Sequence, residues 1–421
     1  MPFYVKSLNN DTKENRLYGC IVRRAREDRQ FSLNFAADST FVNPSHLSKI
    51  EHGKHAASKE YKKILESSLG INVNTCLDFK DEVEEKLIIF FNCWATCNAQ
   101  GMKDIYNQFI ENKSEYKYSF AFPYYDFLII FYEVIFEKDL TNAKKILDEM
   151  KNYKNLLETP YQLLYQDLKA QYYLKTSSRE KAKEIYEDLD KEIPSSPKNS
   201  IIFSIIYYHL TYFNALSNEI DIAIKYYKRA RNMLADLFMF ERIAFLGIVI
   251  ANGYTSANQY EKAMNIYENI LSFYSRENKQ GEMQMLYANM SYCALKEKNY
   301  EKAIDYVRQL DLSKDLYLSA SFYEPYALWM MGRYKETKQI IEDNINTKNM
   351  KTKLIQEIIL NSIEGKVEEA FKACDHACQI IEKDKDFENQ EFIYKIGLKI
   401  ATDNNLLEEK YKYLELLYNM K

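Results

Sequence analysis

The stretch QYEKAMNIYENIL at residues 259–271 is followed by a near-copy, NYEKAIDYVRQL, at residues 299–310. The alanines at the same point of the two copies, Ala263 and Ala303, lie 40 residues apart. A small residue recurs at this point along the chain, at Ala143, Ala182, Ala223, Thr337 and Ala370. Two antiparallel helices approach closely only where the side chains between them are short. The spacing therefore predicts a series of helix pairs, each with a small residue near the start of its second helix.

This pattern resembles the tetratricopeptide repeat (TPR), in which such an alanine marks the start of the second helix. The resemblance implies an all-α chain in which roughly nine helix pairs stack into a right-handed α-solenoid with a concave inner face. The usual small residue on the first helix, 12 positions earlier, is kept as Ala170, Ala251 and Ser291. It is replaced by Phe131 and Pro325 in other repeats, so the pattern is less regular than the uniform type.

The composition agrees with a long helical chain. Its 421 residues include only 10 Gly and 7 Pro, too few turn-forming residues for a β-rich protein of this length. Seven scattered cysteines form no secreted-type framework, and the first fifteen residues lack an apolar signal core. We therefore expect a cytoplasmic protein without a membrane span. No motif predicts a catalytic centre, a cofactor or a metal site, so an enzyme is not expected.

The charge is unevenly distributed along the chain. Residues 1–75 contain 12 Lys and Arg against 8 Asp and Glu, a net charge of +4. Because the whole chain carries −4, residues 76–421 carry −8. We treat residues 1–75 as one domain, called the head, and residues 76–421 as a second domain, called the body. A basic head on an acidic body indicates that any contact with nucleic acid is made by the head.

The head contains three predicted helices with well-marked ends. The first covers residues 14–30, and Ser32 can cap a second over residues 33–39. The third covers residues 44–52, with Asn43 as its N-cap and a proline in its first turn.

Residues 32–53 resemble, without gaps, the helix-turn-helix of the phage-repressor-like (Cro/C1, or XRE) DNA-binding family. The matching features are Leu33, Ala37, Val42, Pro44-Ser45, Leu47-Ser48-Lys49-Ile50-Glu51, Gly53 and the first-helix arginines in VRRAR at residues 22–26. Phe41 departs from the family, which usually has glycine in this turn. The resemblance implies that the third helix enters the major groove with its N-terminal residues on base edges.

The resemblance also implies separate roles for the residues of this motif. The outward-facing candidates to read bases are Ser45, His46 and Lys49. The candidates to contact backbone phosphates are Ser32, Asn34, Asn43 and Lys54. Glu51 is expected to pair with Arg26, since a partly buried carboxylate needs a cation. Helix-turn-helix geometry also occurs in helical proteins that do not bind DNA, and this alternative stays open.

A head of this kind on a TPR-like body resembles the RNPP-type regulators, the group of Rgg-, NprR-, PlcR- and PrgX-like proteins. The resemblance implies a cytoplasmic transcription regulator that binds a short signalling peptide in the repeat channel. It also implies a homodimer that reads palindromic double-stranded DNA. The alternative is a repeat scaffold that sequesters a signalling protein, as the related Rap-type proteins do, with or without DNA binding.

Candidate peptide contacts come from helix positions that should face the concave side, 11 and 14 residues before each repeat alanine, and from one nearby tryptophan. Asparagine suits this task because its carboxamide both donates and accepts hydrogen bonds. The candidates are His209, Tyr212, Asn252, Asn289, Tyr292, Tyr326 and Trp329. For the aromatic residues, packing between repeats is an equally good interpretation.

Overall fold

The computed structural model describes residues 13–195, 197, 201–312, 320–343, 349–383 and 387–420. The first twelve residues, most of the segment predicted to lack a signal core, lie outside the described residues. Every regular element described is a helix, and one isolated β-bridge joins Asn74 to Ser119. The all-α prediction is therefore confirmed. No helix in the described part of the chain is long and apolar enough to cross a membrane.

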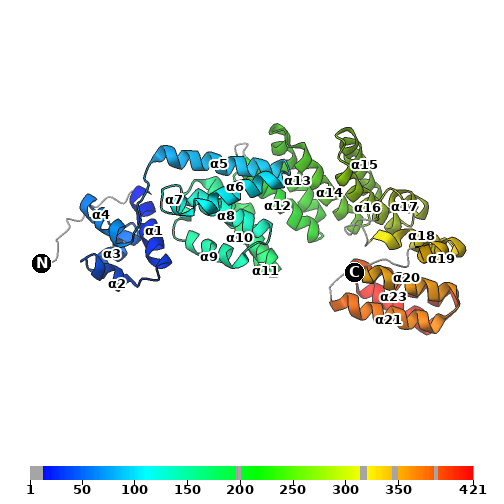
Figure 1. The fold of residues 1–421 in the computed structure, drawn as a ribbon. Helices are drawn as coiled ribbons and strands as arrows, with labels where there is room; N and C mark the ends of the chain where they lie inside the picture. The colour runs from blue at the N-terminus through cyan, green and yellow to red at the C-terminus, as the bar shows by residue number, and fades with distance from the viewer. Residues whose placement is uncertain are drawn as a thin grey trace. The chain divides into compact units, whose positions relative to one another are not determined.

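The chain divides into two compact units, Met1–Leu246 and Gly247–Lys421 (Figure 1). Helix α14 (Phe240–Ser256) runs through the division. In the first unit, the head holds α1 (Lys13–Asp28), α2 (Leu33–Ser39), α3 (Pro44–Glu51) and α4 (Lys59–Ser68). The body part of this unit holds α5 (Leu77–Ala95), α6 (Ala99–Glu111), α7 (Lys113–Lys117), α8 (Phe122–Ile135), α9 (Leu140–Met150), the 3₁₀ turn η1 (Lys154–Leu156), α10 (Thr159–Lys175), α11 (Arg179–Glu192), α12 (Ile201–Leu216) and α13 (Ile220–Asp236).

The second unit continues the same succession of helices. They are α15 (Tyr260–Arg276), α16 (Gln280–Glu297), α17 (Tyr300–Val307), α18 (Tyr323–Met330), α19 (Tyr334–Asp343), α20 (Met350–Ile363), α21 (Val367–Lys383), α22 (Phe387–Asp403) and α23 (Leu407–Asn419).

The repeat alanines occupy one structural position. Each is the fourth residue of the second helix of a pair: Ala143 in α9, Ala182 in α11, Ala223 in α13, Ala263 in α15, Ala303 in α17 and Ala370 in α21. Thr337 is the fourth residue of α19. All seven are completely buried. The sequence prediction of helix pairs that meet at a small residue is confirmed, because a longer side chain at this point would hold the helices apart.

The tight turns within the pairs explain the low glycine content. A residue with positive φ lies just before the second helix of each pair, and it is usually not glycine: Ser177, Asn218, Asn258, Lys298 and Asn405 all have φ between 56° and 66°. The hydrogen bonds at Asn218 are typical. Its N–H donates to the Ala215 carbonyl, and the next N–H donates to the Asn214 carbonyl. This is the Schellman arrangement, in which the left-handed residue completes the helix end.

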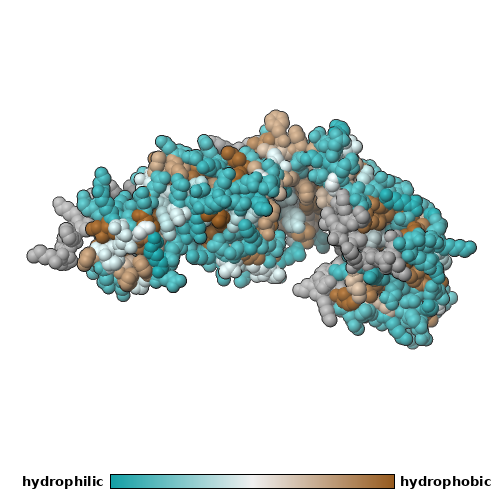
Figure 2. Space-filling view, in the orientation of Figure 1, coloured by the Kyte–Doolittle hydropathy of each residue, from teal (hydrophilic) through white to brown (hydrophobic). Residues whose placement is uncertain are grey.

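The first helices of the pairs supply most of the core. In α8, every residue from Phe122 to Val134 is buried, including the polar residues Asp126 and Glu133. The second helices are amphipathic, with α9 burying only Ala143, Ile146, Leu147 and Met150. Hydrophilic residues cover most of the face of each unit seen in Figure 2. The apolar helices are thus inside the stack and the amphipathic ones cover them.

Candidate functional site

The ends of α2 and α3 are built by the predicted capping residues. The Ser32 hydroxyl accepts a hydrogen bond from the Phe35 N–H, 3.1 Å away. The Asn43 side-chain oxygen accepts one from the Ser45 N–H at 2.8 Å, and Pro44 begins α3. Both caps leave side-chain donor groups, the Ser32 hydroxyl and the Asn43 amide, on an exposed surface.

Most of the residues predicted to contact DNA are exposed. Leu47 and Ile50 of α3 are completely buried, whereas Ser45 and Lys49 on the same helix are exposed. The predicted phosphate contacts Ser32, Asn34, Asn43 and Lys54 are exposed as well. The two faces of α3 therefore have the composition that the sequence predicts.

His46 is the exception among these residues. Its ring is only partly exposed and lies 5.5 Å from the ring of His55 and 6.1 Å from that of Tyr61. Its Nε2 atom is buried and has no hydrogen-bond partner. Burial lowers the pKa of His46, with further lowering from His55 and Lys49. In this structure His46 packs α3 against the loop that follows it, so less of its side chain is accessible to a base than in Ser45 and Lys49.

Phe41 takes up the left-handed conformation at the position where Cro/C1-like proteins usually have glycine. Its φ is +57°, and its side chain is 83% exposed. The Phe41 N–H donates to the Asp38 carbonyl and the Val42 N–H donates to the Ala37 carbonyl. The turn therefore keeps its geometry with a strained residue in it, because a Cβ is unfavourable at positive φ.

Three of the arginines of α1, Arg23, Arg24 and Arg26, form ion pairs within the protein. The predicted pair of Arg26 and Glu51 is confirmed: Nε and Nη2 of Arg26 lie 2.6 and 2.9 Å from the two carboxylate oxygens of Glu51. Arg23 pairs with Glu27 on the surface at 2.8 Å. The positive charge available to a ligand on the head is thus provided mainly by lysines, including Lys49 and Lys54.

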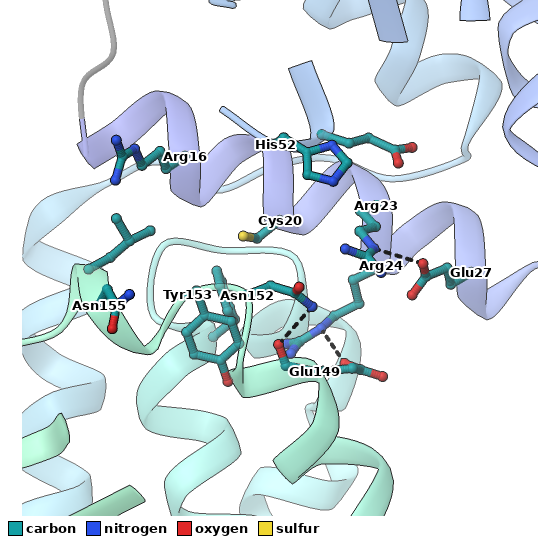
Figure 3. Close-up of a pocket in the computed structure, with 13 residues that line it drawn as sticks. Arg16, Cys20, Arg23, Arg24, Glu27, His52, Glu149, Asn152, Tyr153 and Asn155 are labelled. Carbon is teal, nitrogen blue, oxygen red and sulfur yellow. Dashed lines mark hydrogen bonds and ion pairs between the residues drawn. The ribbon is translucent and has the colours of Figure 1, made fainter. Parts of the chain in front are cut away.

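Arg24 links the head to the body, which the sequence did not predict. Its guanidinium is buried and bonds both carboxylate oxygens of Asp126 on α8, and it contacts Glu149 on α9 at 3.2 Å. Tyr153 donates its hydroxyl to the same Asp126 carboxylate. Figure 3 shows Arg24 reaching from α1 toward Glu149, at the edge of a cleft that Cys20 and Tyr153 also line. This contact was not predictable from sequence patterns, because its partners lie over 100 residues apart.

His209 and Tyr212 line a cleft of about 640 Å³ in the first unit. Tyr212 is 40% exposed, whereas His209 is buried and its Nδ1 lies 2.7 Å from Asp167. The other lining residues are Trp94, Ile135, Gln171, Leu174, Lys175, Ser177, Arg179, Tyr208, Phe213, Leu216 and Arg242. Burial raises the pKa of the Asp167 carboxyl, and His209 and Tyr186 act against that rise. His209 thus belongs to the floor of the cleft and Tyr212 to its accessible wall.

The remaining peptide candidates lie in the second unit and differ in exposure. Asn252 is exposed and its side-chain oxygen accepts a hydrogen bond from the Tyr267 hydroxyl, while Asn289 and Tyr292 are half-buried.

Two of the predicted peptide contacts are core residues. Tyr326 and Trp329 are 2% and 1% exposed. Tyr326 packs on the ring of Phe392, and the Lys399 ammonium lies 5.2 Å from the centre of the Trp329 ring. In this structure they fill space between helices, the packing interpretation that the sequence left open.

The chain is similar in fold and in sequence to several known proteins. No family model matches the chain. The fold is similar to the apo form of RapI, with a TM-score of 0.64 and 12% identity over 80% of this chain and 97% of that one. It is also similar to the apo form of the quorum sensor NprR from B. thuringiensis, with a TM-score of 0.61 and 17% identity over 81% and 99% of the two chains. In sequence, 309 residues are 19% identical to the transcriptional activator NprA of Geobacillus stearothermophilus, covering 72% of this chain and 76% of NprA.

The chain is similar to the transcriptional activator NprA in sequence and to NprR in fold, which agrees with the expected resemblance to the RNPP-type regulators. Similarity to a transcriptional activator agrees with the expectation that the chain is not an enzyme. The structural similarities establish the TPR-like fold. The contacts of Arg24 and Arg242 became visible only in the folded chain, because their partners are distant in sequence.

Proposed function

We propose that the protein is a cytoplasmic, peptide-responsive transcription regulator. It binds DNA through the helix-turn-helix formed by α2 and α3, and a short signalling peptide bound in the repeat body switches it. The observation that carries the proposal is the division of α3 into a buried apolar face and an exposed face with Ser45 and Lys49. The similarity to the transcriptional activator NprA supports it.

Several features of the head support DNA binding. The exposed residues around α3 offer donors of the kinds that contact phosphates and base edges: hydroxyls, amides and ammonium groups. Ser45 and Lys49 are one helical turn apart on α3, so both side chains point to the same side. In this proposal Ser45 and Lys49 read bases, and Ser32, Asn34, Asn43 and Lys54 hold the phosphate backbone.

The cleft around Tyr212 supports peptide binding. Its volume falls within the range of about 300–1,000 Å³ typical of ligand sites, and aromatic rings form much of its wall. NprR has been solved in complex with its cognate peptide NprX, in a structure whose fold is similar to this one with a TM-score of 0.50. Asn252 and Asn289 in the second unit remain candidates for further peptide contacts.

The exposed face of α23 supports a dimer. Leu407, Tyr411, Leu414 and Tyr418 follow the 4-3-4 spacing of a coiled-coil seam, and they are 67%, 71%, 43% and 77% exposed. The opposite face of α23 packs against α22 within the same chain, where the Tyr413 ring lies close to Gly397.

The charges beside this seam favour a second copy of the chain as the partner. In a parallel two-stranded seam, Lys410 of one copy meets Glu415 of the other, five residues further along. Neither residue forms an ion pair within the described chain. A two-fold pair of α23 helices would satisfy both and cover the four apolar residues.

DNA binding is tested by fluorescence anisotropy of the full-length protein with genomic DNA fragments at several salt concentrations. The wild type should prefer particular fragments, and Lys49→Ala should weaken binding to those by roughly 5- to 150-fold, about 1–3 kcal/mol. Lys63→Ala on α4 is the matched control, since it removes an ammonium group that is also exposed on the head. It should lower affinity uniformly and leave the preference intact. Equal effects of both substitutions on every fragment would refute base reading by α3.

The second candidate function is a repeat scaffold that sequesters a signalling protein. The similarity of the body to RapI favours it, over 97% of the RapI chain, although at 12% identity this establishes only a shared fold. The two functions make different demands on α3. A scaffold would keep its partner protein in the Lys49→Ala variant, whereas the regulator would lose its preferred DNA.

A further inference from the structure

The cleft around Tyr212 contains a cation that lacks an anionic partner. The guanidinium carbon of Arg242 lies 4.2 Å from the centre of the Trp94 ring and 5.3 Å from that of Tyr208. One amino group of Arg242 donates to the Trp94 carbonyl. Its Nε is buried and has no hydrogen-bond acceptor, and no described carboxylate lies within ion-pair distance of it. A buried donor without an acceptor is costly, so the site lacks a group that accepts.

The charged side chains among the described residues of the cleft wall are cations. They are Lys175, Arg179 and Arg242, and no Asp or Glu is among the described residues that line the cleft. The other two cations are already engaged: Lys175 pairs with Glu137 at 2.7 Å, and Arg179 donates to the Leu216 carbonyl at 2.6 Å. Such a cleft in an otherwise acidic body concentrates anions. Arg179, like Arg242, forms no ion pair with a described carboxylate, but Arg242 is the one that lies against an aromatic ring and has a buried donor without an acceptor.

The rings of Trp94 and Tyr208, whose planes are 86° apart, contact the guanidinium of Arg242 and hold it in the cleft. A guanidinium can donate two N–H groups to one carboxylate. Lysine could not do this, because its ammonium group is a point charge without a planar fork. The wall next to this position is made of Tyr212, Phe213 and Leu216, which suits apolar side chains adjoining the acid.

We infer that Arg242 anchors a carboxylate of the signalling peptide, either its C-terminus or an aspartate or glutamate side chain. This inference rests on the proposed function and names the chemistry that the peptide must carry. The rings of Trp94 and Tyr208 position the guanidinium, and Tyr212 contacts the peptide residue beside the one that carries the carboxylate.

The experiment offers the full-length protein two pools of random synthetic hexapeptides, one with a free C-terminal carboxylate and one with a C-terminal carboxamide. Retained peptides are identified by mass spectrometry. The wild type should retain members of the free-acid pool, and from the amidated pool only peptides that contain Asp or Glu. Retention from the amidated pool separates a side-chain anchor from a C-terminal one.

The variants test Arg242 itself. Arg242→Gln should reduce retention by roughly 10- to 100-fold, the loss expected for hydrogen bonds to a charged group. Arg242→Lys should recover only part of it. Arg231→Gln, which removes an exposed guanidinium from α13 outside the cleft, should bind like the wild type. Circular dichroism and thermal unfolding of each variant confirm that its fold is kept.

The possible outcomes separate this inference from the proposed function. Retention of amidated peptides without Asp or Glu, or equal retention by Arg242→Gln in its folded form, overturns the carboxylate anchor and leaves peptide binding standing. Retention of no peptide from either pool overturns both.

Discussion

At the scale of single residues, Phe41 carries backbone strain at the turn between the helices proposed to bind DNA. Phe41→Gly should stabilise the protein by roughly 0.5–1 kcal/mol. The steric energy released by removing a Cβ at positive φ exceeds the conformational entropy cost of folding a glycine. Phe41→Ala is the control: it removes the same exposed ring, keeps the Cβ and should bring no such gain. Urea unfolding measures the difference. Equal stability of the two variants would show that the ring, and not φ, determines the effect.

Glu133 gives a second residue-scale prediction, on pH dependence. It accepts hydrogen bonds from the Tyr106 hydroxyl and the Asn142 amide, and burial raises its pKa to about 7. The folded chain therefore binds a proton more tightly than the unfolded chain, whose glutamate titrates near 4.5. Stability from this group is present at low pH and is lost as the pH rises from about 4.5 through 7.

Glu133→Gln removes this titration. The free energy of unfolding should therefore depend less steeply on pH between about pH 5 and 8 than in the wild type, as measured by urea denaturation at each pH. Glu111→Gln, at an exposed position on α6, should keep the wild-type slope. A wild-type slope in Glu133→Gln would mean that another group produces the pH dependence.

At the scale of elements, α23 packs on α22 with one face and exposes an apolar seam on the other. Lys410→Glu should weaken dimerisation by roughly 5- to 30-fold, since two Lys–Glu pairs become like-charge pairs across the two-fold seam. The double variant Lys410→Glu with Glu415→Lys should restore the wild-type dimer, because the pairs re-form with reversed sign. Light scattering at a series of concentrations measures both. A wild type that stays monomeric, or a double variant no better than the single one, would exclude this seam.

At the scale of the whole molecule, Arg24 determines whether the head and the first repeats behave as one body. Arg24→Ala leaves Asp126 buried without its cation and should cost about 3–5 kcal/mol. In this variant the rate of amide hydrogen exchange should increase more in α1 to α4 than in α10 to α13, relative to the wild type. The control is Arg23→Ala, one residue away, whose exposed pair with Glu27 should contribute less than about 1 kcal/mol. If both variants exchange alike, the head is held by other contacts, such as those of Asp28 with Lys117 and Tyr118.

The sequence by itself determined the local features of this protein. The repeat alanines, the caps at Ser32 and Asn43 and the pairing of Arg26 with Glu51 were all predicted and are all present. The alanines and the caps depend on residues close in sequence or on a fixed helical spacing, so the periodicity of side chains is enough to place them. The pair of Arg26 and Glu51, 25 residues apart, was predicted from the family resemblance.

Only the tertiary structure decided which charges and rings are available to a ligand. It buried Arg24, turned His46 toward His55, placed Tyr326 and Trp329 in the core and stacked Arg242 on Trp94, 148 residues earlier. The same type of residue can lie in the core, pack between two elements or bind a ligand, because its environment is set by partners from distant repeats. Helical spacing fixes which side of its own helix a residue occupies, and packing against those partners decides whether that side meets protein or solvent.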